Sequence, residues 1–476
     1  MIRYVVATLL ALISTGAVPP HAAAQNTQDA DPILRTEDAI AITGVTVTDG
    51  TGAAPRPNMT ILIRAGRIVS LFPAQTGSIS PDYVMIEGDG GTLLPGFVMM
   101  HEHLFYPDST GGYFADPEAF SRLYLAGGAT TIRTAGSIDP YADLATARAV
   151  AANAQIGPDI DVTGAYLEGS PPSVARMPVI DSAQRAARYV DYWADEGVTS
   201  FKAYENLKPD ALTATIAAAH RNGIRVTGHL CAASYAEAAR AGIDNIEHSF
   251  ASASDFVSDR TPGACPPWIE RIKALNRLDP DGAEIGRLIR ILIDNKVALT
   301  STLAIFETLA ADRPLPDEDA LVPLSDGLKQ FFTTTAAAAR ASPFGPAVAE
   351  LLPRLGRMER RFVREGGLLL AGSDPTGFGG VVPGSATARQ YELMIEAGFT
   401  MAEAIRVMTL NGAIYLGRAQ DIGSIEVGKR ADLVFLHGDL ASDPRAMRKP
   451  AIVFKSGKGY DPSAIRAQYK GRIGIE

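Results

Sequence analysis

Two histidines that follow an apolar run are the residues whose types and spacing point most directly to chemistry. The run Pro95–Met100 leads into His101, Glu102 and His103. Alternate side chains of a strand share one face, so His101 and His103 point the same way and Glu102 the opposite way. Neutral imidazoles paired at a strand end can bind a divalent metal. A lone His-x-His pair is also common without a metal, so its weight depends on the rest of the chain.

Other strand-like runs downstream also end in residues that could bind a metal. They lead into Lys202, His229, His248 and Asp374. The chain has only seven histidines, and four of them follow such runs. Any one of these residues could be an ordinary core or loop residue. That explanation is weak for the whole set, because ligands at the ends of several strands are typical of a metal site on a parallel sheet.

This set of residues resembles the amidohydrolase superfamily of metal-dependent hydrolases. His101 and His103 match its strand-one His-x-His, and the run from Asn411 to Val434 is similar to its closing segment. The remaining candidates match its lysine of strand four, its histidines of strands five and six and its aspartate of strand eight, in that order: Lys202, His229, His248 and Asp374. The likeness covers nearly all of the chain after the leader and is greatest to the dipeptidase and imidazolonepropionase-like branches.

The resemblance implies two divalent metal ions, for which imidazole and carboxylate ligands favour zinc. His101, His103 and Asp374 would hold one ion and His229 and His248 the other. Lys202 would react with carbon dioxide to give a carbamate that bridges both ions; the alternative is a surface or salt-bridged lysine. A metal-bridging hydroxide would attack the substrate carbonyl, and Asp374 would carry the proton to the leaving nitrogen or would serve only as a ligand.

Further residues near these strand ends are candidates for contacts with the substrate. Tyr204 could hydrogen-bond an oxyanion or could simply pack in the core. Tyr166 and Phe378 follow the expected third and eighth strands and could line a pocket. Arg133, on the expected second strand, could hold a substrate carboxylate or could equally be a structural ion-pair partner.

The first 24 residues have the three regions of a secretory signal peptide. One basic residue precedes an apolar stretch from Tyr4 to Val18, and Ala22–Ala24 supplies small residues before Gln25. We therefore expect a secreted or periplasmic protein with no membrane anchor after cleavage. An oxidising compartment would allow a disulfide between the two cysteines, Cys231 and Cys265; two buried free thiols are the alternative.

The elements between these residues alternate, which predicts an α/β fold with a (β/α)₈ TIM barrel over residues 93–415. Helical stretches are expected at 117–126, 141–153, 181–196, 210–222, 235–241, 284–295 and 348–365. Long connections at 251–281 and 309–346 are expected to be lids or specificity loops, or a helical insertion in the second case. Strands at 39–47, 59–71, 431–436 and 451–455 predict that residues 25–92 and 416–476 together form a small β-sandwich domain.

Composition narrows the classes of function. The 476 residues carry a formal net charge of -9 and no basic tract, which argues against a nucleic-acid partner. We expect an enzyme that hydrolyses an amide or peptide-like C–N bond of a small molecule, such as a dipeptide or an N-acyl amino acid. A single-metal cyclic-amide hydrolase of the imidazolonepropionase type, a lactone or phosphoester hydrolase and a non-catalytic periplasmic binding protein are the alternatives. The oligomeric state stays open, a homo-oligomer included.

Overall fold

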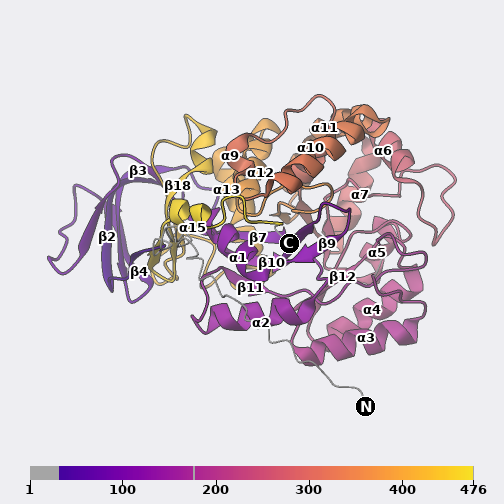
Figure 1. Ribbon diagram of the computed structural model, residues 1–476, viewed down its shortest axis with the longest axis horizontal. Coiled ribbons are helices and arrows are strands. Elements are labelled where there is room, and N and C mark those ends of the chain that lie inside the picture. Colours follow the sequence, from indigo (N-terminus) through magenta and orange to yellow (C-terminus); the bar gives the residue numbers. More distant parts are fainter. Residues whose placement is uncertain (1–31, 175–176, 475–476) are drawn as a thin grey trace, which may run out of the picture.

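The computed structural model describes residues 32–174 and 177–474 (Figure 1). The expected leader, residues 1–24, lies outside the described residues. Within the described part, no helix is both long enough and apolar enough to cross a membrane. The fold combines an open sheet built from both ends of the chain with a layer of parallel strands surrounded by helices.

Strands from the two ends of the chain pair in one nine-stranded sheet. Its order is β1-β19-β18-β17-β6-β2-β3-β4, with β5 paired to β2. The strands are β1 (Ile33–Arg35), β2 (Ala39–Val47), β3 (Arg56–Arg64), β4 (Arg67–Pro73), β5 (Val84–Glu87), β6 (Thr92–Pro95), β17 (Leu433–Leu436), β18 (Pro450–Lys455) and β19 (Lys458–Tyr460). Figure 1 shows indigo β2–β4 at one end of the molecule, next to yellow β18. The two ends therefore form a composite unit, while the two-layered sandwich and the domain boundaries stay predictions.

One expected strand of this sheet, 59–71, is wrong, because the chain turns back within it. β3 and β4 form an antiparallel hairpin in which Arg64 faces Arg67. The two residues between them, Ala65 and Gly66, have φ of 49° and 74°. Positive φ at both central residues is what a tight hairpin turn requires, because its twist then matches that of the strands.

Eight parallel strands carry the candidate site. β7 (Phe97–Glu102), β10 (Ala129–Thr134) and β11 (Asp159–Asp161) form one sheet. The second sheet contains β12 (Ser200–Ala203), β13 (Arg225–Gly228), β14 (Asn245–Glu247), β15 (Ala298–Ser301) and β16 (Leu369–Ala371). A parallel bridge between Thr163 and Ser200 links them on one side, and the Asp374 amide donates to the His101 carbonyl, 3.0 Å away, on the other. The arrangement is TIM-barrel-like, and a fully closed ladder stays a prediction.

Helices follow most of these strands and cover them. They are α1 (Pro117–Ala126), α2 (Pro140–Ala151), α3 (Ala183–Glu196), α4 (Pro209–Arg221), α5 (Tyr235–Ala241), α6 (Trp268–Asn276), α7 (Ala283–Asp294), α8 (Leu303–Leu309), α9 (Glu318–Leu321), α10 (Asp326–Ala341), α11 (Phe344–Arg364), α12 (Ser385–Glu396), α13 (Met401–Met408), α14 (Leu410–Tyr415) and α15 (Pro462–Gln468). A 3₁₀ turn lies at Pro444–Arg448, and β8 (Phe105–Pro107) and β9 (Tyr113–Ala115) form a hairpin. The expected helices are confirmed within a few residues. Both long connections contain helices, α6 in the first and α9 and α10 in the second, so the second is a helical insertion.

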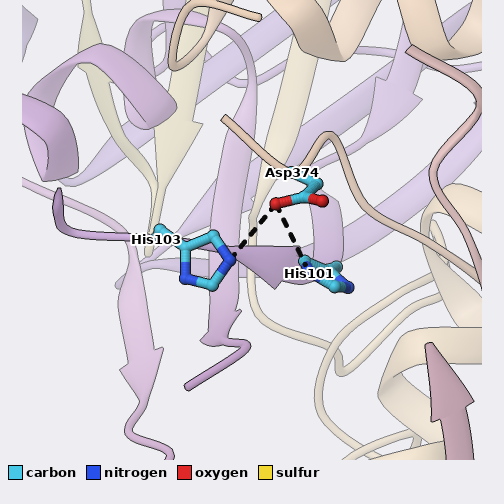
Figure 2. A group of neighbouring side chains, drawn as sticks. All are labelled: His101, His103 and Asp374. Atoms are coloured by element: carbon cyan, nitrogen blue, oxygen red, sulfur yellow. Dashed lines mark ion pairs between the residues drawn. The ribbon is translucent and has the colours of Figure 1, made fainter. Parts of the chain in front are cut away.

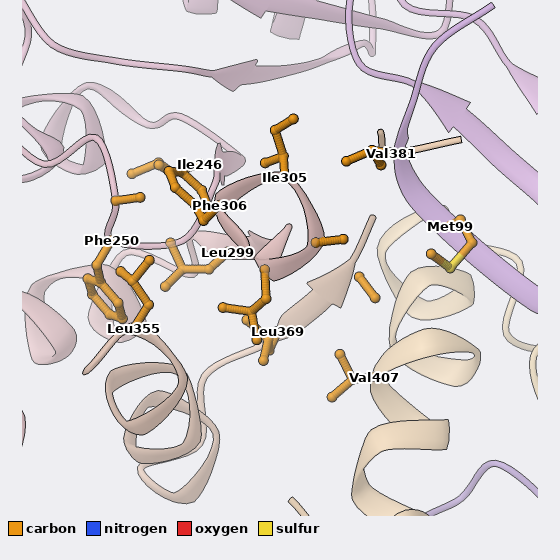
Figure 3. Packing of buried hydrophobic residues seen from close by; sticks show 14 of the residues in the cluster. Met99, Ile246, Phe250, Leu299, Ile305, Phe306, Leu355, Leu369, Val381 and Val407 are labelled. Atoms are coloured by element: carbon orange, nitrogen blue, oxygen red, sulfur yellow. The ribbon is translucent and has the colours of Figure 1, made fainter. Parts of the chain in front are cut away.

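Strands and helices share a large apolar core. Figure 3 shows Met99, Ile246, Leu299 and Leu369 from the parallel strands in the same cluster as Leu355 of α11 and Val407 of α13. These side chains are completely or almost completely buried. Burying a side chain of this size contributes about 1.5–3 kcal/mol, so the core holds the strand ends in fixed relative positions.

Candidate metal centre

All six residues predicted as metal ligands lie together at the carboxyl ends of the parallel strands. His101 lies on β7 and Lys202 on β12, and the others directly follow strands or a short extension of them: His103, His229, His248 and Asp374. Nε2 of His101 is 3.5 Å and Nε2 of His103 is 3.3 Å from Oδ1 of Asp374 (Figure 2). Carboxyl ends of parallel strands meet at one edge, which is why residues so far apart in sequence converge.

The second half of the centre adjoins the first. The His248 ring centroid is 4.7 Å from that of His101 and 4.4 Å from that of His229. Nζ of Lys202 lies 3.4 Å from Nε2 of His101. Lys202 therefore lies beside His101, and its role as a bridge between the two groups of candidate ligands stays a prediction. His229 has the most accessible side chain of the four histidines, 20% exposed.

The His-x-His pair has its outer ring nitrogens fixed by acceptors. Nδ1 of His101 donates to Oε2 of Glu247 at 2.7 Å, and Nδ1 of His103 donates to the Gly136 carbonyl at 3.2 Å. Each hydrogen bond sets the tautomer and leaves the Nε2 lone pair free to bind a cation. These are the two Nε2 atoms that face Asp374.

The other two histidines are held in a comparable way. Nε2 of His229 lies 3.4 Å from Oε1 of Glu205, which leaves Nδ1 as its ligand atom. Nδ1 of His248 shares a 2.8 Å hydrogen bond with the Thr302 hydroxyl, which leaves Nε2. Partners of this kind orient metal-binding histidines in proteins and typically affect metal affinity by about 10- to 100-fold.

Burial and nearby charges shift the pKa values of these groups in both directions. Burial and Lys202 would lower the pKa of His101, but Glu247 and Asp374 raise it above its ordinary value. Burial lowers the pKa of His103 to about 4 and holds the pKa of His248 well below its ordinary value, so both are neutral. Burial alone would raise the pKa of Asp374, but His101 and His103 hold it well below its usual range. Burial also lowers the pKa of Lys202 to about 8, although Glu247 and Asp374 oppose the shift.

The donor set fits divalent metal ions. The ligand atoms of His101, His103 and Asp374 all lie within 4.8 Å of one another and are buried. Neutral imidazoles with a carboxylate are the ligands that zinc, and also manganese, cobalt or iron, prefer. The centre also shows backbone strain of the kind that gathers at functional sites, because His248 and Asp374 have φ of 61° and 54°.

The predicted substrate-contacting tyrosines flank Lys202. Its Nζ is 5.5 Å from the Tyr166 ring centroid and 5.6 Å from that of Tyr204. Tyr204 also packs against the His229 ring, with centroids 4.9 Å apart. Phe378 is half-buried in the turn after Asp374. The two tyrosines are thus placed beside the candidate ligands, while contact of any of these residues with a substrate stays a prediction.

Arg133 does not line the centre as a carboxylate-binding residue would. It is almost completely buried, donates through Nε to the Met100 carbonyl at 2.9 Å and pairs with Oε1 of Glu247 at 2.5 Å. Its Nε and Nη2 atoms are therefore occupied inside the fold. The structure contains the alternative, a structural ion-pair partner, and contact of Arg133 with a substrate stays a prediction.

Sequence reasoning missed the acceptors that orient the histidines. Glu247 directly precedes His248, and Glu205 follows Lys202 by three residues. An acidic residue close in sequence to these two candidate ligands was the signal that could have indicated hydrogen-bond acceptors in the centre. Strand alternation hid the role of Glu247, because neighbouring residues of a regular strand point to opposite faces.

The two cysteines form a disulfide close to the centre. Cys231 and Cys265 are joined with their Cα atoms 4.9 Å apart, so the predicted bridge is confirmed. Cys231 lies two residues after His229, and Cys265 lies just before α6. The bridge therefore ties the long connection after His248 to the end of β13.

Comparisons with known proteins agree with this geometry. Imidazolonepropionase of Clostridium tetani (strain Massachusetts / E88) is 32% identical over 178 residues, which are 36% of this chain and 39% of that protein. The match thus spans well under two thirds of the length of that imidazolonepropionase. Two solved structures share the fold with TM-scores of 0.66: a Xaa-Pro dipeptidase (18% identity, 89% of this chain and 100% of that one) and bottromycin amidohydrolase (21% identity, 90% and 88%).

The family model of the amidohydrolases matches residues 92–459, which include all of the parallel strands and every candidate ligand. A match over most of the chain, together with the convergence of the ligands, shows that the chain belongs to the amidohydrolase family.

Proposed function

We propose that this chain is a metal-dependent hydrolase that cleaves the C–N bond of an amide or peptide-like small molecule. The observation that carries the proposal is the convergence of four histidines, Lys202 and Asp374, with one nitrogen of each imidazole held by a partner. Oriented donors around a compact, buried space suit cations, and the family match supports hydrolysis of C–N bonds.

Two divalent ions, zinc in preference to others, are the proposed cofactor. His101, His103 and Asp374 would hold one ion, and His229 and His248 the other. Bound ions of this kind lower the pKa of a water molecule and polarise the substrate carbonyl. The chain's own residues orient the ions and the substrate, exclude bulk water and move the proton.

Asp374 is the proposed proton carrier. Its carboxylate is ionised and sits among the ligands, so it can accept a proton at one oxygen and deliver it to the leaving nitrogen. Tyr204 lies beside His229 and Lys202, where its hydroxyl could donate to the oxygen that becomes negative during attack. Both residues act on the substrate itself, so we propose them as catalytic residues.

Lys202 is proposed to carry a carbamate formed with carbon dioxide. Its side chain is almost completely buried, and in the described residues no carboxylate lies within ion-pair distance of its Nζ. An unpaired ammonium in such a place is unfavourable, which favours the neutral amine that reacts with carbon dioxide. A carbamate there would supply one negative charge shared by two oxygens, which suits a ligand of divalent ions.

The substrate class is proposed as a dipeptide or an N-acyl amino acid. The second candidate is a single-metal hydrolase of a cyclic amide, which the match to imidazolonepropionases favours. The two differ in metal content, because a single-metal site needs no bridging Lys202. Elemental analysis of the purified protein separates them, with two ions per chain expected for the first and one for the second.

Site-directed variants test the proposal. Chelation should abolish hydrolysis of an amide and dipeptide panel, and added zinc or manganese should restore it. His101→Ala and His229→Ala should each lower the metal content by about one ion per chain, because each removes a ligand of a different ion. His220→Ala is the matched control: His220 pairs with Asp244 on the surface, outside the centre. Full metal content in both site variants would refute the assignment.

We also propose that the protein acts outside the cytoplasm, as a secreted or periplasmic enzyme. The composition of residues 1–24 supports export, and the Cys231–Cys265 disulfide suits an oxidising compartment. The proposed partner is a small-molecule substrate. N-terminal sequencing of the exported protein should give a start at or near Gln25, and an intact Met1 there would contradict the proposal.

A further inference from the structure

Glu247 is a completely buried carboxylate with an unusually full set of donors. Its Oε2 accepts from Nδ1 of His101 at 2.7 Å. Its Oε1 accepts from Arg133 at 2.5 Å, from Nδ2 of Asn245 at 3.1 Å and from the Thr227 hydroxyl. Three donors therefore fix Oε1 and His101 fixes Oε2, so the carboxylate is held against the outer nitrogen of His101.

Glu205 takes the corresponding place on the other side of the centre. Its Oε1 lies 3.4 Å from Nε2 of His229 and accepts from Arg271 at 2.7 Å. Arg271 comes from α6, in the connection after β14, and its side chain is only 3% exposed. Glu205 is 20% exposed, so it tolerates substitution better than Glu247 does.

The two sets have the same construction but do not share a residue. In each, a buried arginine holds a glutamate, and the glutamate holds the outer nitrogen of a histidine: Arg133–Glu247–His101 and Arg271–Glu205–His229. The two histidines belong to different proposed ions. An arginine on a carboxylate keeps it ionised and oriented, and an ionised acceptor keeps an imidazole in one tautomer with a more basic free nitrogen.

We propose that Glu247 and Glu205 are positioning residues that set the affinities of the two metal ions separately. Glu247 acts on the ion at His101, His103 and Asp374, and Glu205 acts on the ion at His229 and His248. The inference rests on the proposed dinuclear function and goes beyond it, because it assigns each ion its own Arg–Glu pair. A merely structural role would instead lower stability without distinguishing the two ions.

Stepwise zinc titration of the metal-free protein against a chelating indicator tests this. Glutamine keeps the size of glutamate but lacks its charge, and its amide can turn either its oxygen or its nitrogen toward the histidine. Glu205→Gln should weaken one binding step by about 10- to 100-fold and change the other by less than about threefold. Glu247→Gln should do the reverse. Glu359→Gln is the control for changing a buried carboxyl outside the centre: Glu359 bonds Ser301, and its replacement should leave both steps unchanged.

Double variants assign each step to its ion. In a His229→Ala background one ion is lost, and Glu205→Gln should then change the remaining step by less than about threefold. Glu247→Gln in that background should still weaken the remaining step by about 10- to 100-fold. This pattern is a readout that general destabilisation cannot produce, because lost stability would act in either background. Near-UV circular dichroism shows whether each variant is folded.

Equal weakening of both steps by Glu205→Gln, or an undiminished effect of Glu205→Gln after His229→Ala, would overturn the inference. If Glu247→Gln does not fold, Glu247→Asp keeps the charge beside Arg133 but shortens the reach to His101, and the same step should weaken. Wild-type protein that binds two ions while the variants bind them normally refutes the inference alone. Wild-type protein that binds only one ion refutes both the dinuclear proposal and the inference.

Discussion

The proposed carbamate on Lys202 leads to a prediction about Lys202→Ala: the variant should lose metal, and small carboxylates should restore part of its activity. Lys202→Ala removes the side chain beyond Cβ and with it the anionic bridge between the ions. Even an outer partner of a ligand typically changes metal affinity by about 10- to 100-fold. A bridging ligand serves both ions, so their combined affinity should fall by at least about 100-fold, which is about 2.7 kcal/mol.

The space left by the side chain makes the prediction specific. Lys202 is almost completely buried between His101 and the rings of Tyr166 and Tyr204, so truncation leaves an enclosed gap beside the ligands. Formate or acetate fits such a gap and offers the same pair of oxygens as a carbamate. Activity of Lys202→Ala should therefore return in part when either anion is added at tens of millimolar, together with bound metal.

Lys202→Met is the control for this rescue. Methionine fills most of the same space without a charge, so metal should be lost as in Lys202→Ala but small carboxylates should restore nothing. For the wild type, reconstitution in buffer free of carbon dioxide should be slow and should accelerate with bicarbonate. A Lys202→Ala enzyme that holds two ions, turns over normally and ignores both bicarbonate and carboxylates would refute the reasoning.

Other expected outcomes concern proton transfer and stability. Asp374→Asn should keep its metal but lower kcat by about a hundredfold or more, because an amide is a poor proton acceptor; near-normal kcat at full metal occupancy would remove Asp374 from proton transfer. Cys231→Ser with Cys265→Ser should lower the free energy of unfolding by up to about 4 kcal/mol, given the separation of 34 residues, and an unchanged denaturation midpoint would contradict this. Burial raises the pKa of Glu359 to about 8. The folded chain therefore keeps a proton that the unfolded chain loses above its ordinary pKa, and stability should fall by about 2 kcal/mol or more between pH 6 and 9. Glu359→Gln should flatten that dependence in urea titrations, and identical slopes would count against it.

The sequence was sufficient to predict which residues converge, because two simple regularities apply to them. Side chains alternate along a strand, which puts His101 and His103 on one face, and the carboxyl ends of parallel strands meet at one edge. Glu102 also behaves as the alternation predicts: it accepts from the amide of Ser373 at 2.9 Å and takes no part in the candidate centre. These regularities concern the backbone, so they needed no knowledge of side-chain partners.

Partners of the ligands could not be predicted in this way, because they depend on how side chains pack in three dimensions. The residue type of Arg133 is compatible with a substrate carboxylate, but in the fold its guanidinium pairs with Glu247, a partner that strand alternation does not predict. The hairpin at Ala65 and Gly66 was missed for a different reason: the apolar pattern continues across the turn, and only the Ala-Gly pair marks it. Helices α9 and α10 were expected only as one of two alternatives for the second long connection, a helical insertion without bounds, because a loop was the other alternative.

The strained backbone at His248 explains how two neighbouring residues, Glu247 and His248, both lie against the ring of His101. Glu247 and His248 are neighbours, and a regular strand would send them to opposite faces. His248 instead has a φ of 61°, a conformation that costs a non-glycine residue about 1–3 kcal/mol. With the chain turned there, Glu247 lies 2.7 Å from Nδ1 of His101 while the His248 ring lies 4.7 Å from the His101 ring. The Ser249 amide, which donates to the Thr300 carbonyl at 2.9 Å, holds this turn against the neighbouring strand. The strained conformation therefore places the candidate ligand His248 and the carboxylate of Glu247 around the His101 ring, which a regular strand would not do.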